Sequence, residues 1–335
     1  MRRVFSSLLT LVFTSMLLFL GAALWWLHEP LTLQTQPGNA VLDLEIEPGT
    51  SAKGVAEATV ASGAKTQTSW LYLWFRLSGE SRLIRAGSYE ISPGTTPRTL
   101  LRMLVRGEEA LKSVTLPEGW NFNQVMMALK TAEQLRPDAQ AMSPEALMAI
   151  LGKPGVHPEG RFFPDTYTYA KGSSDLAVLK RAARAMDKRL DAAWALRRPD
   201  TPLNSPEDAL ILASIIEKET GKPFDRAAIG GVFTNRLRIR MLLQTDPTVI
   251  YGMGSQFDGN LRRRDLQTDT PYNTYTRAGL PPTPIAMPGR AALLAAVQPA
   301  QTDALYFVSR GDGSSQFSAT LDEHNRAVNK YIRGR

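Results

Sequence analysis

The chain opens on an apolar run. Residues 4–27 carry no charge between Arg3 and His28, and a run of this length can cross a hydrocarbon core as one helix. The arginines before it, with Trp25 and Trp26 at its end, predict a membrane anchor whose residues 1–3 lie in the cytoplasm. A cleaved signal peptide is the alternative, although bulky residues stand where cleavage needs small ones. On either interpretation the remainder of the chain lies beyond the cytoplasmic membrane.

A strand–turn–helix pattern follows a polar linker at residues 28–40 and occurs twice. "LDLEIEPGTSAKGVAEATV" and "AGSYEISPGTTPRTLLRML" each alternate as a strand, turn at Pro-Gly and continue as a helix after a Thr or Ser cap. Between them, "SWLYLWFRLSG" predicts an apolar helix, whose aromatic residues are more typical of a core than of a ligand contact. Residues 41–108 are therefore predicted to form a small α+β domain.

Residues 109–335 are predicted to form a larger, mixed α/β domain. It begins with a strand, a turn and a helix in "LKSVTLPEGWNFNQVMMAL", and a helix with Ser143 as its cap follows. Long helices are expected in "SSDLAVLKRAARAMDKRLDAAWALRR", "SPEDALILASIIEKETG" and "DRAAIGGVFTNRLRIRM". The segment 244–288 is loop-like, and loops of this length are usually functional. A helix at 290–298, a hairpin and a final helix at 321–333 end the domain.

Two glutamates near the end of the second of these long helices differ in helical phase. The helix starts after the cap Ser205 and stops at Gly221, so it covers about residues 206–220. At about 100° per residue, Glu219 falls on the apolar face and Glu217 on the opposite side. We expect Glu217 to be solvated and Glu219 to project toward the core or a cleft wall.

A carboxylate on an apolar face is costly unless it is paired or protonated. Burial and the negative end of the helix dipole both raise the pKa of Glu219, which suits a general acid near neutral pH. The alternative is a structural ion pair between Glu219 and Arg236 or Arg238. The residues alone leave these two interpretations open.

Composition excludes several kinds of site. The chain of 335 residues has no cysteine, which rules out disulfides, thiolate-bound metals and thiol nucleophiles. Its three histidines are far apart, so no metal and no cofactor is expected. The net charge of +7 favours an acidic partner or simply serves solubility. Nucleic acid is not an expected partner, because the domains lie outside the cytoplasm.

Several stretches together resemble the YceG/MltG-like endolytic murein (peptidoglycan) transglycosylases. They are "EGRFFPDTY", "ASIIEKETG", "VFTNRLRIRMLLQTDPTVIYGMG", "YNTYTRAGLPPTPIAMPG", "LYFVS" and "TLDEHN", in the order of the family. The resemblance implies a LysM-like small domain, a catalytic transglycosylase domain, and an anchor in the cell inner membrane that holds the catalytic domain in the periplasm. One position departs from the family, since Ser315 stands where many members have a histidine.

The resemblance also implies a reaction. Glu219, the second glutamate of the EKET motif, would protonate the MurNAc-β-1,4-GlcNAc bond, and the C6 hydroxyl of the muramic acid would attack C1 to leave a 1,6-anhydroMurNAc end. Cleavage in nascent strands would terminate glycan elongation. The residues expected to bind the glycan, each with a purely structural alternative, are Gln244, Thr245, Asp246, Tyr251, Tyr272, Asn273, Tyr275 and Glu159.

Two other functions stay open at this point. A muramidase that uses water would need a second carboxylate, for which Glu159 is the best candidate. A non-catalytic peptidoglycan-binding scaffold would grip glycan with the small domain and keep Glu219 in an ion pair. The expected partners are peptidoglycan glycan strands, the membrane through one helix, and peptidoglycan synthases near the place of strand synthesis.

Overall fold

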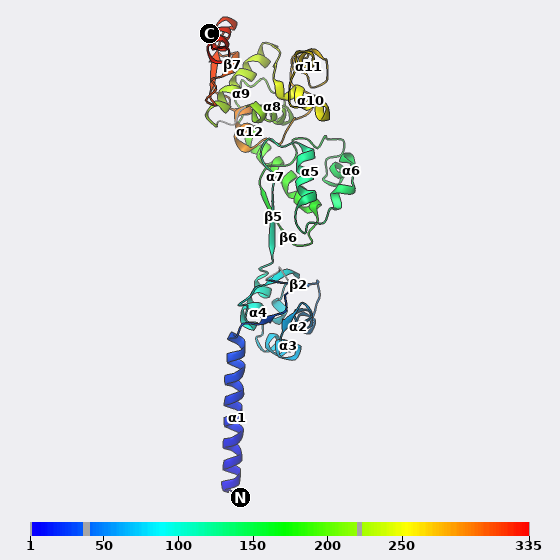
Figure 1. Ribbon diagram of the computed structural model, residues 1–335, viewed down its shortest axis with the longest axis vertical. Helices are drawn as coiled ribbons and strands as arrows, with labels where there is room; N and C mark the ends of the chain where they lie inside the picture. The colour runs from blue at the N-terminus through cyan, green and yellow to red at the C-terminus, as the bar shows by residue number, and fades with distance from the viewer. Residues whose placement is uncertain (1, 36–40, 220–222, 335) are drawn as a thin grey trace. The chain divides into compact units, whose positions relative to one another are not determined.

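The chain combines helices with short two-stranded sheets. The computed structural model describes residues 2–35, 41–219 and 223–334, so the expected helix stop at Gly221 and part of the linker lie outside the described residues. The chain folds as two compact units, residues 1–112 with 170–172 and residues 113–169 with 173–335. Figure 1 shows the elements of both. The predicted mixture of α and β structure is confirmed.

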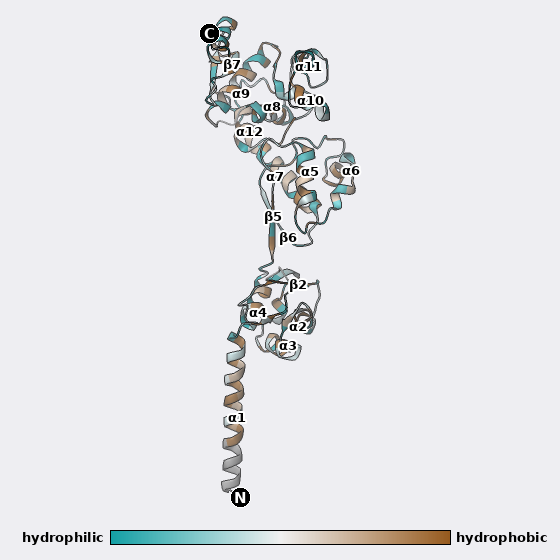
Figure 2. Cartoon of the chain, viewed as in Figure 1, coloured by the Kyte–Doolittle hydropathy of each residue, from teal (hydrophilic) through white to brown (hydrophobic). Residues whose placement is uncertain are grey.

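The first unit begins with the apolar helix α1 (Arg2–His28). Its segment Leu11–His28 has a mean hydropathy of 1.7, and among the described helices it is the one long and apolar enough to cross a membrane. A signal sequence would meet the same criterion. Figure 2 shows hydrophobic residues along the described part of this helix.

The rest of the first unit contains the two predicted strand–turn–helix repeats. In both, the cap is confirmed: Ser51 accepts a hydrogen bond from the Gly54 N–H, and Thr96 accepts one from the Thr99 N–H. The elements are β1 (Thr32–Leu33), β2 (Leu42–Ile46), α2 (Ala52–Ala61), β3 (Ala64–Lys65), α3 (Thr68–Leu77), η1 (Ser81–Leu83), β4 (Gly87–Ile91) and α4 (Pro97–Arg106).

Alternation along the strands places the core of this unit. β2 pairs antiparallel with β4, with Leu42 opposite Ile91, and every second residue of β2 is buried. Leu71 and Phe75 of α3 complete the same core, together with Leu100 and neighbouring residues of α4. The apolar helix predicted in "SWLYLWFRLSG" is confirmed, and Phe75 within it is fully buried.

The second unit is mainly helical. Its elements are β5 (Leu111–Thr115), α5 (Phe122–Thr131), η2 (Asp138–Ala141), α6 (Pro144–Ile150), β6 (Thr166–Ala170), α7 (Asp175–Ala195), α8 (Pro206–Glu219), α9 (Pro223–Arg238), α10 (Asp246–Met253), η3 (Gly254–Gln256), α11 (Arg263–Gln267), α12 (Arg290–Val297), β7 (Tyr306–Ser309), β8 (Ser315–Ser318) and α13 (Leu321–Tyr331). β5 pairs with β6, and β7 pairs with β8.

The segment 244–288 is more ordered than its composition predicts. It contains α10, η3 and α11, because Pro247 starts a helix at its first turn instead of breaking one. The aromatic segment after Pro164 includes strand β6. The cap Ser143, the terminal hairpin and the final helix are confirmed.

Two hydrophobic clusters fill the second unit. One is built around α5, α6, β6 and the first half of α7, and the other around α8, α9 and α12. Helix α9 approaches its neighbours closely through Gly230 and Gly231. A Cβ atom at Gly230 would lie 2.5 Å from the carbonyl oxygen of Ala295, and one at Gly231 would lie 2.7 Å from that of Ala300. Helix α9 therefore packs closely against α12 and the segment that follows it.

Candidate active site

Helix α8 carries both glutamates of the EKET motif in its last turn. At its start the Ser205 hydroxyl accepts a hydrogen bond from the Asp208 N–H (3.2 Å), and the Asp208 carboxylate accepts one from the Asn204 N–H (2.8 Å). These bonds satisfy donors at the helix start, as the sequence predicts. Residues 209–216 are all buried, so α8 is enclosed on every side up to its last turn.

Glu217 is not solvated, contrary to the expectation from helical phase. Its side chain is 6% exposed, and it accepts hydrogen bonds from the Gly289 N–H (2.8 Å) and from Arg226 Nη2 (3.3 Å). Burial raises its pKa, which these two bonds oppose. The phase argument assumes a single buried face, whereas α8 is packed all round. Glu217 therefore ties α8 to α9 and to the N-terminus of α12.

Glu219 is half-buried at the C-terminal end of α8. Its Oε1 atom accepts a hydrogen bond from the hydroxyl of Thr245. Burial raises the pKa of the Glu219 carboxyl, and the negative charge of Asp246 adds to this, while the Thr245 bond and Arg236 act in the opposite direction. The net direction is upward, so the environment favours the protonated, neutral form that a general acid needs.

Neither arginine of the ion-pair alternative is bound to Glu219. The guanidinium of Arg236 is committed to backbone carbonyls, with Nε 2.7 Å from Leu305 O and Nη1 2.7 Å from Leu243 O. Arg238 pairs instead with Asp200 at the surface (2.5 Å). Among the described residues, no ion pair includes Glu219. Arg236 thus acts on Glu219 through its field, a role that sequence reasoning considered only as a salt bridge.

Three of the residues predicted to bind glycan lie around Glu219. Thr245 and Asp246 form the start of α10, and the Tyr275 hydroxyl donates to Asp246 Oδ1 (2.5 Å). Gln244, directly before them, is exposed and has a positive φ of 49°, a conformation that non-glycine residues rarely adopt and that is common at functional sites. The start of α10 and the loop at Tyr275 therefore form one wall beside the carboxyl of Glu219.

Asn273 has a structural position. It is fully buried, and its Nδ2 donates to the carbonyl oxygens of residues 265, 266 and 268. Its Oδ1 accepts from the Tyr275 N–H (2.8 Å). The structure therefore places Asn273 inside the loop, in agreement with its structural alternative, where it holds Tyr275.

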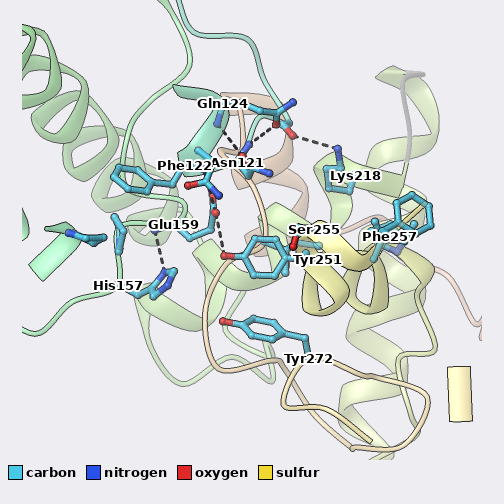
Figure 3. A pocket seen from close by; sticks show the side chains of 18 of the residues that line it. Asn121, Phe122, Gln124, His157, Glu159, Lys218, Tyr251, Ser255, Phe257 and Tyr272 are labelled. Atoms are coloured by element: carbon cyan, nitrogen blue, oxygen red, sulfur yellow. Dashed lines mark hydrogen bonds between the residues drawn. The ribbon is translucent and has the colours of Figure 1, made fainter. Parts of the chain in front are cut away.

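The other predicted residues line a cavity of about 1110 Å³. Its wall includes Glu159, Tyr251 and Tyr272, and Figure 3 shows the Tyr251 hydroxyl pointing at Glu159. That bond is 3.0 Å long, and the two tyrosine rings are 4.9 Å apart in an edge-to-face arrangement. Pro247 of α10 and Lys218 of α8 also line the cavity, so it extends next to the wall described above.

Glu159 is 2% exposed and is bound through both of its oxygens. These accept hydrogen bonds from the Phe122 N–H at the start of α5 (3.0 and 3.1 Å), and Oε2 accepts the Tyr251 hydroxyl as well. Burial raises the pKa of Glu159 to about 7 in spite of these bonds. The carboxyl therefore links α5 to α10 across the cavity wall.

Sequence reasoning missed several residues of this cavity. Asn121 caps α5 in a reciprocal capping box with Gln124, and both line the cavity. His157 and Phe257 line other parts of it (Figure 3). The capping box is readable from the sequence, but its place in a cavity is not. Within the described ranges, no group of three His, Asp or Glu side chains could hold a metal ion.

Comparison with known proteins gives consistent relatives. A family model described as the YceG-like family matches residues 44–330. An endolytic murein transglycosylase of Bacillus subtilis (strain 168) is 30% identical, over 94% of this chain and 91% of its own. An endolytic murein transglycosylase of Streptococcus pneumoniae (strain D39) is 27% identical. The match covers 74% of this chain and 51% of that protein. A crystal structure of a YceG-like protein from Listeria monocytogenes, 28% identical, matches with a TM-score of 0.54 and covers 85% of this chain and 98% of its own.

Proposed function

Since the chain belongs to the YceG-like family, we propose that it is a peptidoglycan lytic transglycosylase with Glu219 as its catalytic residue. The observation that carries this proposal is the setting of Glu219. It is a half-buried carboxyl whose pKa is raised, it is oriented by the Thr245 hydroxyl, and among the described residues it has no cationic partner. Glu159 also has a raised pKa and, among the described residues, no cationic partner, but hydrogen bonds from Phe122 and Tyr251 hold both of its oxygens in a closed position, whereas Glu219 is half-buried at a helix end.

The proposed reaction uses this one carboxyl twice. Protonated Glu219 gives its proton to the glycosidic oxygen of the MurNAc-β-1,4-GlcNAc bond, which breaks as positive charge develops at C1 of the muramic acid. The C6 hydroxyl of the same sugar then attacks C1, and the Glu219 carboxylate takes up the hydroxyl proton. The products are a 1,6-anhydroMurNAc end and a free GlcNAc end, and no water is consumed.

The neighbours of Glu219 suit the charge that develops in this reaction. Asp246, fixed by the Tyr275 hydroxyl, places a negative charge near the carboxyl of Glu219 and raises its pKa. Thr245 fixes the orientation of the carboxyl. The side chain of Gln244 is exposed next to them and can bind a sugar hydroxyl or acetamido group. Electrostatic groups held in place before the reaction are usually the largest contribution to catalysis.

The cavity next to Lys218 offers a place for the glycan chain. Rings of Tyr251 and Tyr272 can pack against the C–H faces of sugars, and Asn121 and Gln124 can bind their polar groups. Glu159 is less suited to the water-using alternative, because both of its oxygens are already bound by neighbouring donors. A hydrolase would instead need a carboxylate able to activate a water molecule.

The remaining parts of the proposal concern location and domains. α1 would anchor the chain in the cell inner membrane with its N-terminus in the cytoplasm, residues 41–108 would be a LysM-like glycan-binding domain, and residues 109–335 would be the catalytic domain in the periplasm. The length and composition of α1 support the anchor. Cleavage of nascent strands near their synthases would then terminate elongation.

The test is to incubate the purified protein with uncrosslinked glycan strands and to weigh the products. Anhydro ends, one water lighter than hydrolysis products, are expected. Glu219→Gln is expected to lower the rate by about 10²–10⁴-fold, the usual contribution of a general acid or base. Asp191→Asn, which neutralises an exposed carboxylate on α7, serves as the matched control, and Glu217→Gln is expected to keep cleavage as long as it folds. Products that carry the added water would identify a muramidase, and the absence of cleavage would identify a scaffold.

A further inference from the structure

Trp70, near the start of α3, lies against two aromatic side chains of α1. Its ring centroid is 6.0 Å from that of Phe19 and 5.7 Å from that of Trp26. Phe19 and Trp26 are seven positions apart in α1, so they lie on one face of the helix, about 10 Å apart along its axis. Trp70 therefore packs against the side of α1, next to its last turns.

These last turns belong to the apolar segment. The side chains of residues 11–22 are exposed, and the segment Leu11–His28 has a mean hydropathy of 1.7. With α1 across a bilayer, as proposed above, Trp25 and Trp26 mark the outer interface, where tryptophan is enriched. Phe19 is then roughly 10 Å deeper, at 1.5 Å per residue. The contact with Phe19 places the start of α3 at the boundary between headgroups and acyl chains.

Helix α3 carries an apolar stripe that begins with Trp70. Leu73, Trp74 and Leu77 follow it at spacings of three and four residues and share its side of the helix. Leu73 is 46% exposed and Leu77 is 74% exposed, although both are large and apolar. Leucine and tryptophan are the residues that interfacial helices insert into lipid. Trp74 is half-buried against the core of this unit, with its Nε1 donating to Pro97 O (3.2 Å), so we call Trp70, Leu73 and Leu77 the α3 surface.

The charges near the α3 surface complement a lipid headgroup layer. Arg76 in α3 and Arg82 after it are exposed cations, while the side chain of Arg85 lies against Gly107 at the end of α4. Glu80 is the one acidic residue in the segment 68–86. Anionic lipids attract such basic clusters at a membrane surface. An apolar stripe flanked by arginines is the pattern of a helix that lies in the interface.

We propose that the α3 surface docks into the lipid interface of the same bilayer that α1 crosses. The proposal rests on the membrane anchor proposed above and adds a second membrane contact to it. The occupant is lipid and not another protein, because the ring contacts with Phe19 and Trp26 fix the depth of α3 within the apolar length of α1. The small unit is then held at a set height on the membrane by a helix and a surface together.

The experiment uses the full chain in nanodiscs of phosphatidylethanolamine and phosphatidylglycerol. Because the chain has no cysteine, a single introduced cysteine is labelled without ambiguity. Leu77→Cys, labelled with bimane, reports on the α3 surface, and lipids with a doxyl group on the acyl chain quench labels that contact lipid. Leu18→Cys in α1 is the anchor control. Glu45→Cys is the solvent control, since it is exposed on β2, at the end of this unit away from α3 in Figure 1.

We expect doxyl lipid to quench the labels at Leu18 and Leu77, and iodide in the buffer to quench the label at Glu45. A label at Leu77 that behaves like the one at Glu45, while the label at Leu18 is quenched by lipid, overturns the proposal and leaves the anchor in place. A label at Leu18 that lipid does not quench overturns the anchor, and the α3 surface with it. Leu73→Cys repeats the measurement at a second position of the stripe.

Discussion

At the scale of single residues, the two glutamates of the EKET motif have different partners. Glu217 is buried and accepts hydrogen bonds from Arg226 and from the Gly289 N–H. The side chains of Glu217 and Arg226 are both inside the protein. Within the ranges that the structure describes, Glu219 accepts a hydrogen bond from the Thr245 hydroxyl and has no cationic partner, and its pKa is raised. A carboxyl held by a single neutral donor can lose and regain a proton without leaving a buried cation unpaired. This difference supports the proposal that Glu217 has a structural role and Glu219 a chemical one.

The charge of Asp246 is expected to set the pH range of activity. Asp246 raises the pKa of Glu219, and a general acid works only while it is protonated, so the rate falls as the pH rises through that pKa. Asp246→Asn removes the charge and should move the falling limb of the pH–rate profile to lower pH. Tyr275→Phe, which removes the hydrogen bond but keeps the charge, should leave the limb near its original position. A limb in Asp246→Asn at or above that of the unchanged protein would contradict the assignment.

Glu159 is expected to make stability depend on pH. Its pKa rises from an ordinary 4.5 to about 7 in the folded protein, so the folded state holds the proton more tightly than the unfolded one. The stabilisation is therefore complete below about pH 4.5 and is lost as the pH rises through 7. Such a rise corresponds to roughly 3 kcal/mol. The free energy of unfolding, measured in urea at pH 4 and pH 8, should fall by about this amount more in the unchanged protein than in Glu159→Gln.

A matched control for this measurement is Glu145→Gln. Glu145 is exposed to solvent near the same cavity, and its pKa is lowered by hydrogen bonds at the start of α6. Its contribution to stability is therefore present at high pH and lost on acidification, opposite in sign to that of Glu159. An equal pH dependence in Glu159→Gln and in the unchanged protein would show that the carboxyl is not the group responsible.

At the scale of elements, local signals predict where helices begin, and tertiary packing decides what their faces contact. Ser51, Thr96 and Ser143 were readable as caps because each bonds within its own turn. Composition predicts a loop at Pro247, although proline is also common in the first turn of a helix, where the structure has it. The burial of Glu217 could not be predicted, because it depends on helices α9 and α12 that follow later in the chain.

The packing of α9 against α12 depends on a glycine. In Gly230→Ala the added Cβ would lie 2.5 Å from the carbonyl oxygen of Ala295, closer than such atoms approach, so the helices must separate. Overpacking of this kind costs about 1–3 kcal/mol, which exceeds the gain of about 1 kcal/mol from the better helix propensity of alanine. We expect a lower midpoint in thermal unfolding. Arg290→Ala, exposed at the start of α12, should change stability by less than about 0.5 kcal/mol, and an unchanged midpoint in Gly230→Ala would contradict the close packing.

At the scale of the whole molecule, each unit buries its own apolar core. The cluster around β2, β4 and α4 belongs to the first unit, and the clusters around α5 and α8 belong to the second. The site around Glu219 and the cavity at Glu159 are built entirely from the second unit. The proposed chemistry and the proposed membrane contact thus lie in separate parts of one chain, and replacement of α1 should leave the rate of cleavage on soluble strands unaltered.

The consequence is testable with a chain in which residues 1–27 are replaced by a cleaved secretion signal. The released protein should cleave purified strands at the rate of the full chain, because the site does not include α1. In cells that lack the native protein it should fail to restore the length of glycan strands, because a tethered enzyme meets strands at a high effective concentration near the membrane where they are made. Strand lengths are measured by chromatography after the stem peptides are removed.

The control is a chain with an unrelated membrane helix in place of residues 1–27. If tethering alone is sufficient, this chain should restore strand length. Normal strand lengths with the released protein would show that cleavage is not confined to the membrane.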